Sequence, residues 1–203
     1  QMNPHFIYNA LSNIQSLMSP KSVDTASAYL VNFSRLLRSS LESSREDYIL
    51  LEDEISSLKN YLELQQLRYQ SKFEYEIEVD PDIDLESAIL PPMLIQPFIE
   101  NAIEHGIMHK KGPGKVFIRF ARNGKKITCE IEDDGVGREK AWEVEYAKKG
   151  KHKSLATEII RERIAVLNKK LKQKIQLSIS DLKSDDDESP GTRVRLDLPY
   201  MLD

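Results

Sequence analysis

The spacing of hydrophobic residues along the chain changes near residue 72. Up to that point apolar residues recur at steps of three and four, which is the spacing of one face of an α-helix. One stripe consists of Ala26, Leu30, Phe33, Leu37 and Leu41, and the next of Leu51, Ile55, Leu58 and Leu62. Turn signals at Ser19-Pro20 and at 43–47 interrupt the pattern. Residues 1–72 are therefore predicted to form helices with short connections.

After residue 72 apolar and polar residues alternate, as along a β-strand with one buried face. The alternating runs are FEYEIEVD, KVFIRFA, KITCEIE, IQLSIS and RVRLDLP, each bounded by turn residues. Helical patterns lie between them at 94–107 and at about 155–171. The predicted fold class is α+β: a helical hairpin region at 1–72, then a second domain at 73–203 whose helices cover one face of a mixed sheet.

Each helix of the first region has a single apolar stripe. An isolated hairpin leaves much of such a stripe in water, whereas two copies can bury their stripes together in a four-helix bundle. The pattern therefore predicts a homodimer formed through residues 1–72.

Composition narrows the class of protein. With 203 residues, 40% hydrophobic and 31% charged, the chain is typical of a folded globular protein. The net charge of -4 arises from interspersed acids and bases, so no nucleic-acid partner is expected. No apolar run approaches the ~20 residues of a membrane span, and no signal peptide is visible. The lone Cys129 lies in an alternating run and is predicted to be a buried strand residue.

The chain opens with QMNPHFIYNALSNI, in which Asn3 and Pro4 are suited to the start of a helix. His5 and Asn9 then fall on a polar face beside an apolar one. His5 is therefore expected to face solvent. A role as ligand or nucleophile explains an exposed histidine better than packing does. Because the chain begins with Gln, it is expected to be a piece of a longer protein.

A polar pair interrupts the apolar helix LIQPFIENAIEHG, whose Gly106 is expected to close it. Asn101 and His105 lie four positions apart on one face, beside Glu100 and Glu104. Asn is a poor helix former, so Asn101 is either a core residue hydrogen-bonded to backbone or a neutral ligand of Mg²⁺.

Two further stretches follow predicted strands. EIEDDGVG ends a strand with Asp133 and two glycines, and PGTRVRLDLP enters the last strand through Gly191 and Thr192. Each is either a simple turn or part of a site in which a carboxylate accepts a hydrogen bond from an exocyclic amine such as that of adenine. Residues 138–153 lack periodicity and are expected to form a basic loop, either solvated or shielding a triphosphate. The Walker and Rossmann motifs and zinc-ligand spacing are absent from the sequence.

In order, NPHFIYNALSNI, LIQPFIENAIEHG, DDGVG and GTRVRLDLP resemble the sensor histidine kinases of the LytS/YehU type. The resemblance covers nearly the whole chain. It implies a dimerisation and phosphoacceptor region followed by a GHKL (Bergerat-type) α/β sandwich that binds ATP. It further implies these roles: His5 as phosphoacceptor, Asn101 as magnesium ligand, Asp133 as the adenine-reading residue with Gly135 and Gly137 beside it, and Gly191 and Thr192 as the final nucleotide box.

The sequence departs from the family at the end of the lid. Relatives have GxGL, whereas this chain has SLAT, so Ser154 and Leu155 take up nucleotide-contact positions and two glycines are lost. Most histidine kinases of other subfamilies have an acid after the acceptor histidine, whereas Phe6 follows His5 here, which leaves the base unassigned. Asn9 is then expected to orient His5, and Glu100 is the first candidate for a polar helper, with Glu104 and His105 as the others.

The implied function is autophosphorylation of His5 with ATP and Mg²⁺, followed by phosphoryl transfer to an aspartate of a response-regulator receiver domain. The region is expected to be the cytoplasmic portion of a membrane-anchored bacterial protein, with a hinge near 70–73. A pseudokinase scaffold is the alternative. A GHKL ATPase would need a glutamate where the chain has Pro97.

Overall fold

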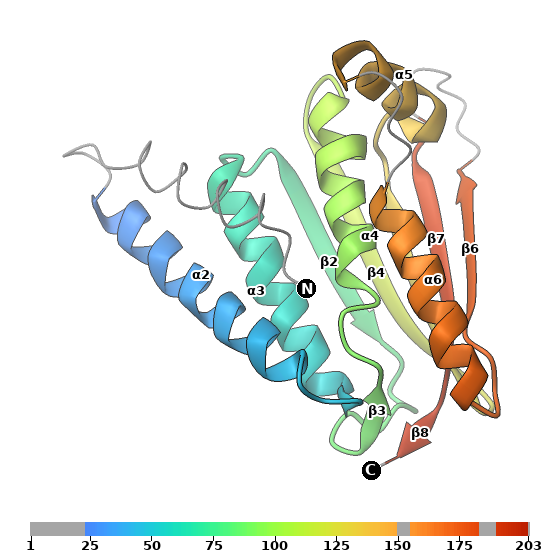
Figure 1. Cartoon of the computed structure of the whole chain (residues 1–203). Helices are drawn as coiled ribbons and strands as arrows, with labels where there is room; N and C mark the ends of the chain where they lie inside the picture. The colour runs from blue at the N-terminus through green and yellow to red at the C-terminus, as the bar shows by residue number, and fades with distance from the viewer. Residues whose placement is uncertain (1–22, 150–154, 183–189, 203) are drawn as a thin grey trace.

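The computed structural model describes residues 23–149, 155–182 and 190–202. Two helices come first, α2 (Val23–Ser43) and α3 (Leu51–Arg68), and they pack as a hairpin (Figure 1). The connection between them includes the short strand β1 (Ile49–Leu50). The turn predicted at 43–47 therefore separates the two helices.

All five predicted strands are confirmed and form one mixed sheet. They are β2 (Phe73–Val79), β4 (Gly114–Asn123), β5 (Lys126–Asp133), β6 (Gln176–Asp181) and β7 (Thr192–Pro199). Within the described residues their order is β2-β4-β5-β7-β6, with β2 parallel to β4 and the other pairs antiparallel. The short strands β1, β3 (Ala88–Leu90) and β8 (Met201–Leu202) form a second sheet that alternation did not predict. Two or three residues are too few to display a period.

The helix predicted at 94–107 is present but is not uniform. It consists of α4 (Gln96–Asn101), a π-helical turn (Ala102–Gly106) and a 3₁₀ turn (Ile107–His109). The expectation that Gly106 closes the helix is wrong, because its φ is -86° and the chain continues into the 3₁₀ turn. The second predicted helix is α6 (Leu155–Lys170).

The expectation of a loop after residue 138 is wrong for the first part of that segment. Residues Gly137–Lys149 form the helix α5. Its sequence, GREKAWEVEYAKK, is rich in Glu, Lys and Ala, which favour helix by intrinsic propensity. Charged residues occupy most of its positions, so its few apolar residues show no helical period in the sequence.

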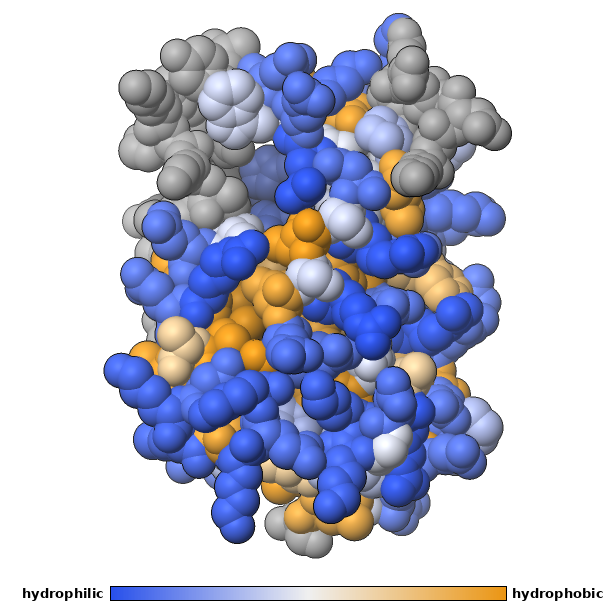
Figure 2. Space-filling view, turned by 90° about the vertical axis from the view of Figure 1, so that its right-hand side faces the viewer, coloured by the Kyte–Doolittle hydropathy of each residue, from blue (hydrophilic) through white to orange (hydrophobic). Residues whose placement is uncertain are grey.

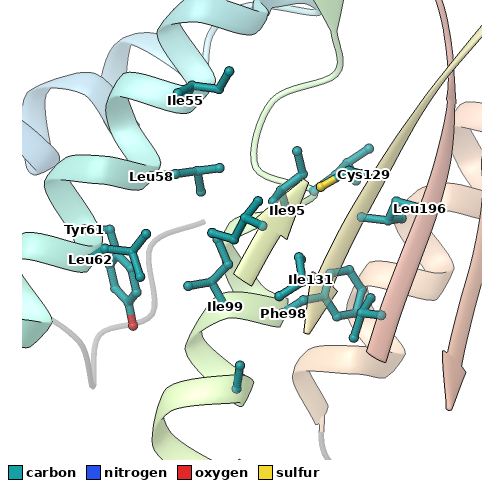
Figure 3. Packing of buried hydrophobic residues seen from close by; sticks show 14 of the residues in the cluster. Ile55, Leu58, Tyr61, Leu62, Ile95, Phe98, Ile99, Cys129, Ile131 and Leu196 are labelled. Atoms are coloured by element: carbon teal, nitrogen blue, oxygen red, sulfur yellow. The ribbon is translucent and has the colours of Figure 1, made fainter. Parts of the chain in front are cut away.

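The core lies between the sheet and the helices on one of its faces. α3 and α4 contribute Leu58, Leu62 and Ile99, which are 1% exposed or less and face buried strand residues such as Ile131 (Figure 3). Cys129 is buried in this core as predicted, and burial raises the pKa of its thiol well above the usual range. The stripe predicted on α3 is confirmed. α3 therefore shares one hydrophobic core with the sheet that follows it.

The stripe predicted on α2 is only partly correct. Phe33 is buried, but Leu30 and Leu41 are 45% and 55% exposed, and Tyr29 and Leu36 occupy the buried face instead. The neighbouring faces of this helix both carry apolar residues, so sequence spacing alone did not distinguish them. None of the described helices has a stretch long and apolar enough to cross a lipid bilayer.

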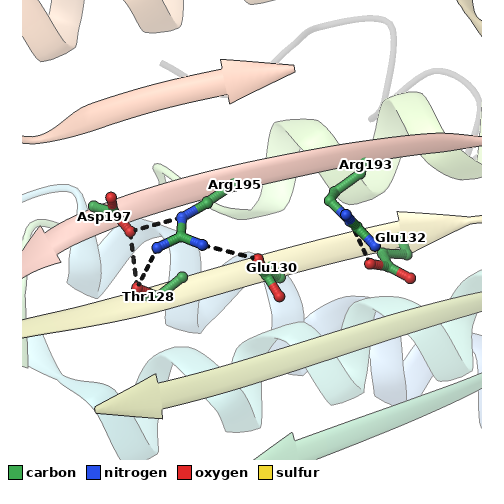
Figure 4. A network of polar contacts seen from close by, with 6 residues as sticks. All are labelled: Thr128, Glu130, Glu132, Arg193, Arg195 and Asp197. Atoms are coloured by element: carbon green, nitrogen blue, oxygen red, sulfur yellow. Dashed lines mark hydrogen bonds and ion pairs between the residues drawn. The ribbon is translucent and has the colours of Figure 1, made fainter. Parts of the chain in front are cut away.

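The other face of the sheet is polar. Arg195 on β7 bonds to Glu130 on β5 at 3.3 Å and to Asp197 at 3.1 Å, while Arg193 pairs with Glu132 (Figure 4). Alternation along the strands places these side chains opposite the core residues. The predicted nucleotide residues lie away from this face, on the helical side and at the strand ends.

Candidate functional site

A cavity of about 300 Å³ opens where α4, α5 and α6 meet the ends of β5, β6 and β7. Its lining residues are Phe98, Asn101, Ala102, His105, Gly106, Asp133, Gly137, Arg138, Ala141, Trp142, Thr157, Arg161, Ile179, Thr192 and Val194. On the face of the molecule that carries α6 and β6, apolar residues lie in the middle and hydrophilic residues surround them (Figure 2). The cavity combines an apolar lining with a few polar groups, which is typical of a small-molecule site.

Strand register brings two of the predicted motifs together. Asp133, at the end of β5, lies directly opposite Thr192, at the start of β7. Asp133 Oδ1 accepts a hydrogen bond from the backbone N–H of Gly135 at 2.9 Å. The backbone N–H of Gly191 donates to the carbonyl of Gly135 at 3.0 Å. DDGVG and GTR thus form one corner of the cavity.

The second acid of the motif has a different environment. Asp134 accepts hydrogen bonds from Lys110 Nζ at 2.8 Å and from the backbone N–H of Lys115 at 2.7 Å. These partners hold its carboxylate against β4, and it does not line the cavity. Asp133 is therefore the acid available to a ligand.

Burial dominates the electrostatics of Asp133. Its pKa is raised to about 7, first because the carboxyl is removed from water and further by the charge of Asp134, while hydrogen bonds from Gly135 and Thr192 oppose the shift. A carboxyl in this position gains from a ligand that donates a hydrogen bond to it, since such a donor replaces lost hydration.

Close packing explains two glycines around Asp133. A Cβ on Gly106 would lie 2.7 Å from Asp133 Oδ1, so any larger residue there would push against the carboxyl. Gly191 has a φ of +72°, and a Cβ on it would clash with the backbone carbonyl of Asp133. Gly106 therefore leaves room for the carboxyl of Asp133. This is its role in the structure, and it does not cap the helix as predicted.

Asn101 and His105 line the same cavity from α4 and the π-helical turn. Asn101 is half-buried, and its side-chain amide makes no hydrogen bond to any residue that the structure describes. The interpretation of Asn101 as a core residue bonded to backbone therefore has no support. π-helical turns are frequent at functional sites, and this one begins directly after Asn101 and contains His105.

The donors present fit a weakly held magnesium ion. No group of three or more His, Cys, Asp or Glu side chains that could hold a metal occurs among the described residues. An amide oxygen such as that of Asn101 supplies one ligand, and phosphate oxygens and water supply the others in sites of this kind.

Glu100 does not line the cavity. It accepts a hydrogen bond from Gln96 Nε2 at 2.9 Å, and burial, with a smaller contribution from the charge of Glu104, raises its pKa to about 7. Glu104 in turn pairs with Arg68 of α3 at 3.2 Å. Glu100 therefore bonds within α4, and Glu104 links the π-helical turn to α3, so neither carboxylate lines the cavity.

Several cavity residues were not predicted from the sequence, and four of them are polar or aromatic residues of α5 and α6. Arg138 and Trp142 come from α5, and Thr157 and Arg161 from α6. Arg161 follows Thr157 by one helical turn, so the i, i+4 spacing is the one signal that links them. The segment that contains the α5 residues was considered as a basic loop that could shield a triphosphate, but the sequence did not single out Arg138 or Trp142.

Three predicted residues, His5, Asn9 and Ser154, lie outside the described residues. Leu155 begins α6, but its side chain is also outside the description. The predicted residues that the structure brings to the cavity are Asn101, His105, Asp133, Gly137 and Thr192, with Gly135 and Gly191 in the adjoining backbone.

Residues 1–73 match the histidine kinase family. The chain is 35% identical over 137 residues to the sensor histidine kinase YpdA of Escherichia coli K12, covering 68% of this chain and 24% of YpdA. It is 32% identical over 137 residues to the sensor protein LytS of Staphylococcus saprophyticus, covering 68% of this chain and 23% of LytS. The chain belongs to the LytS-type sensor histidine kinases. It spans about a quarter of the length of these relatives.

Solved structures agree on the fold of this histidine kinase. The mycobacterial sensor histidine kinase MprB matches 77% of the chain and 98% of its own with a TM-score of 0.51 at 15% identity. Histidine kinase ThkA, solved in complex with response regulator protein TrrA, matches 98% of the chain and 60% of its own with a TM-score of 0.50 at 16% identity. The predicted GHKL architecture, a mixed sheet covered by helices on one face, is confirmed.

Proposed function

We propose that this chain catalyses ATP-dependent autophosphorylation of His5 and passes the phosphoryl group to an aspartate of a response-regulator receiver domain. The observation that carries the proposal is the convergence of Asp133, Thr192, Asn101 and His105 on one cavity. These residues come from three separate stretches of sequence, and each matches a nucleotide motif of the family.

The described residues have distinct tasks in this reaction. Asp133 accepts a hydrogen bond from the exocyclic amine of adenine, while the apolar side chains of Ile179 and Val194 line the space for the base. The amide of Asn101 would hold Mg²⁺, which neutralises charge on the transferring phosphoryl group.

In the chemical step a ring nitrogen of His5 forms a bond to the γ-phosphorus as the bond from that phosphorus to the β–γ bridging oxygen breaks. ADP leaves, and the imidazole proton passes to a base. Catalysis of this kind consists mostly of positioning and charge neutralisation. Asn9 is proposed to orient the imidazole.

The test is labelling with γ-labelled ATP and magnesium. A phosphoramidate label is stable in alkali and labile in acid. We expect His5→Gln to abolish the label and retain ATP affinity, and Asn101→Ala to abolish the label and weaken ATP binding in magnesium. His109→Gln is the matched control, because His109 lies outside the cavity lining and should keep the label. Full labelling of His5→Gln would overturn the assignment of the acceptor.

A pseudokinase is the alternative that one sequence feature favours, namely SLAT at 154–157 in place of GxGL. A pseudokinase would bind ATP in the same cavity and never label, even when longer forms of the protein are tested. An ATPase of the chaperone or topoisomerase sort has less support, because Pro97 occupies the first turn of α4 where such enzymes need a glutamate.

We propose that the protein acts as a homodimer, and the apolar residues exposed on α2 support this. The receiver domain of a response regulator is the proposed partner. Because ATP is the phosphoryl donor, this region is proposed to lie on the cytoplasmic side of a bacterial membrane to which other segments anchor the protein. The predicted division at residue 72 is revised in this proposal. Because α3 shares its core with the sheet, we place the boundary before α3, in the exposed connection at 44–48.

A further inference from the structure

The cavity contains two arginines whose surroundings differ sharply. Arg138 on α5 is bound to Asp181 of β6, with Nε at 3.2 Å from both carboxylate oxygens and Nη2 at 3.0 Å from Oδ2. The backbone N–H of Arg138 also donates to Asp181 at 3.1 Å. Arg138 thereby fastens the start of α5 to the edge strand, and Asp181 neutralises its charge.

Arg161 on α6 forms no hydrogen bond or ion pair with any residue in the described part of the chain. Glu158 lies three positions before it on the same helix, a spacing that commonly supports an ion pair. That pair is not formed. Arg161 instead lines the cavity.

The position of Arg161 relates it to Asn101. α6 packs beside α4, which carries Asn101 (Figure 1). Long side chains on a helix lean toward its N-terminus, so Arg161 extends along the turn that begins at Thr157. Thr157 and Arg161 therefore line the cavity from the helix that neighbours the proposed magnesium ligand.

We propose that Arg161 binds the β- or γ-phosphate of ATP through its guanidinium. The proposal rests on the proposed function, since it assumes that the cavity takes ATP. Asp133 is suited to the neutral base and Asn101 is uncharged, whereas a triphosphate is a polyanion. Among the described residues of the lining, Arg161 supplies the unpaired positive charge, and its planar fork of N–H donors matches phosphate oxygens.

The experiment compares ATP, ADP and adenosine binding to the parent protein, Arg161→Gln and Arg161→Lys by calorimetry. Trp142 is the single tryptophan of the chain and lines the cavity, so its fluorescence gives a second readout. The control is Arg193→Gln, which removes an arginine paired with Glu132 on the outer face of the sheet. Thermal unfolding verifies that each variant is folded.

We expect Arg161→Gln to weaken ATP and ADP binding by about 10- to 100-fold, as for loss of a charged hydrogen bond. Adenosine binding should stay within about twofold of the parent, and Arg161→Lys should recover part of the loss because it keeps the charge. Unchanged ATP affinity in a folded Arg161→Gln variant would overturn the inference, as would an equal loss for adenosine. If the parent itself binds no adenine nucleotide, the proposed function fails instead, and the two failures are distinguishable.

Discussion

At the scale of single residues, three carboxyl groups with little access to water have strongly raised pKa values. Asp133, Glu100 and Glu54 each have a pKa raised to about 7, and burial is the largest cause in every case. Asp133 alone among them lines the cavity. Glu100 and Glu54 do not line it, so a raised pKa by itself does not identify the site.

Replacement of Asp133 should change nucleotide preference. Asp133→Ala removes the acceptor for the adenine amine, so we expect ATP affinity to fall by about 10- to 100-fold and discrimination against GTP to be lost. Calorimetric titrations with ATP and GTP measure both effects. Equal binding of ATP and GTP by the parent protein would refute the adenine assignment.

Glu54 should make stability depend on pH. It is 4% exposed on α3, and its Oε1 has no hydrogen-bond partner among the described residues. Its folded pKa of about 7 exceeds the ordinary value of 4.5 for a glutamate, because burial outweighs the backbone hydrogen bond from Met93 and the charge of Arg163. The folded state therefore binds the proton more tightly, and stability is lost as pH rises from 4.5 through 7, by up to about 1.4 kcal/mol per pH unit.

The matched variants are Glu54→Gln and Glu52→Gln. Glu54→Gln should be more stable than the parent at pH 8 and lose that advantage near pH 5, as measured by denaturant unfolding. Glu52 is exposed on the same helix, and its replacement should have no such pH dependence. A Glu54→Gln effect that is the same at both pH values would contradict the explanation.

At the scale of elements, the π-helical turn places Gly106 against Asp133. Gly106→Ala would bring a methyl group to 2.7 Å from Asp133 Oδ1, and overpacking of this kind costs about 1–3 kcal/mol. We expect ATP affinity to fall by roughly tenfold or more. Gly112→Ala is the comparison, since its φ of +95° makes Ala unfavourable while no atom lies within 4 Å of the added carbon. That variant should lose stability and keep ATP affinity.

The exposed face of α2 predicts how the protein associates. Leu30, Val31 and Leu41 are 45%, 48% and 55% exposed. Placing charges there, as in Leu30→Glu with Leu41→Glu, should convert a dimer at tens of micromolar into a folded monomer, because charge opposes burial of the stripe. Val166 on α6 is 57% exposed, and Val166→Glu should leave the dimer intact. Sedimentation analysis distinguishes these outcomes, and a monomeric parent would count against the bundle.

At the scale of the whole molecule, the predicted hinge at 70–73 is crossed by several contacts. Gln66 Nε2 donates to the Phe73 carbonyl at 3.0 Å, and Lys72 Nζ donates to the Met108 carbonyl at 3.2 Å. With α3 also buried in the common core, rotation at this junction would break packing as well as hydrogen bonds. The connection at 44–48 has exposed residues and is better suited to movement.

Two fragments test this division. Residues 48–203 retain α3 and should unfold cooperatively and bind ATP. Residues 73–203 lack Leu51, Leu58 and Leu62, each 1% exposed or less, so this fragment should lose cooperative unfolding. A stable, ATP-binding fragment 73–203 would restore the boundary at residue 72.

The sequence by itself determined the five long strands, α3, and the motifs that meet at the cavity. Alternation of apolar and polar residues indicates which face of a strand is buried. The motif Asp-Asp-Gly-Val-Gly indicates a strand that ends at a turn. These signals are local, so they can be interpreted without knowledge of the rest of the fold. The same holds for the family resemblance, which depends on short motifs in a fixed order.

Only the tertiary structure decided which face of α2 is buried, that residues 137–149 form a helix, and that Arg161 faces the cavity. α2 has two adjacent apolar faces. Packing against α3 buries Tyr29 and Leu36 and leaves Leu30 and Leu41 exposed. α5 forms by intrinsic helix propensity, without an apolar period. The hydrogen bond from its Arg138 to Asp181 depends on a strand 43 residues away. Such choices depend on contacts between distant segments, and no local pattern in the chain encodes them.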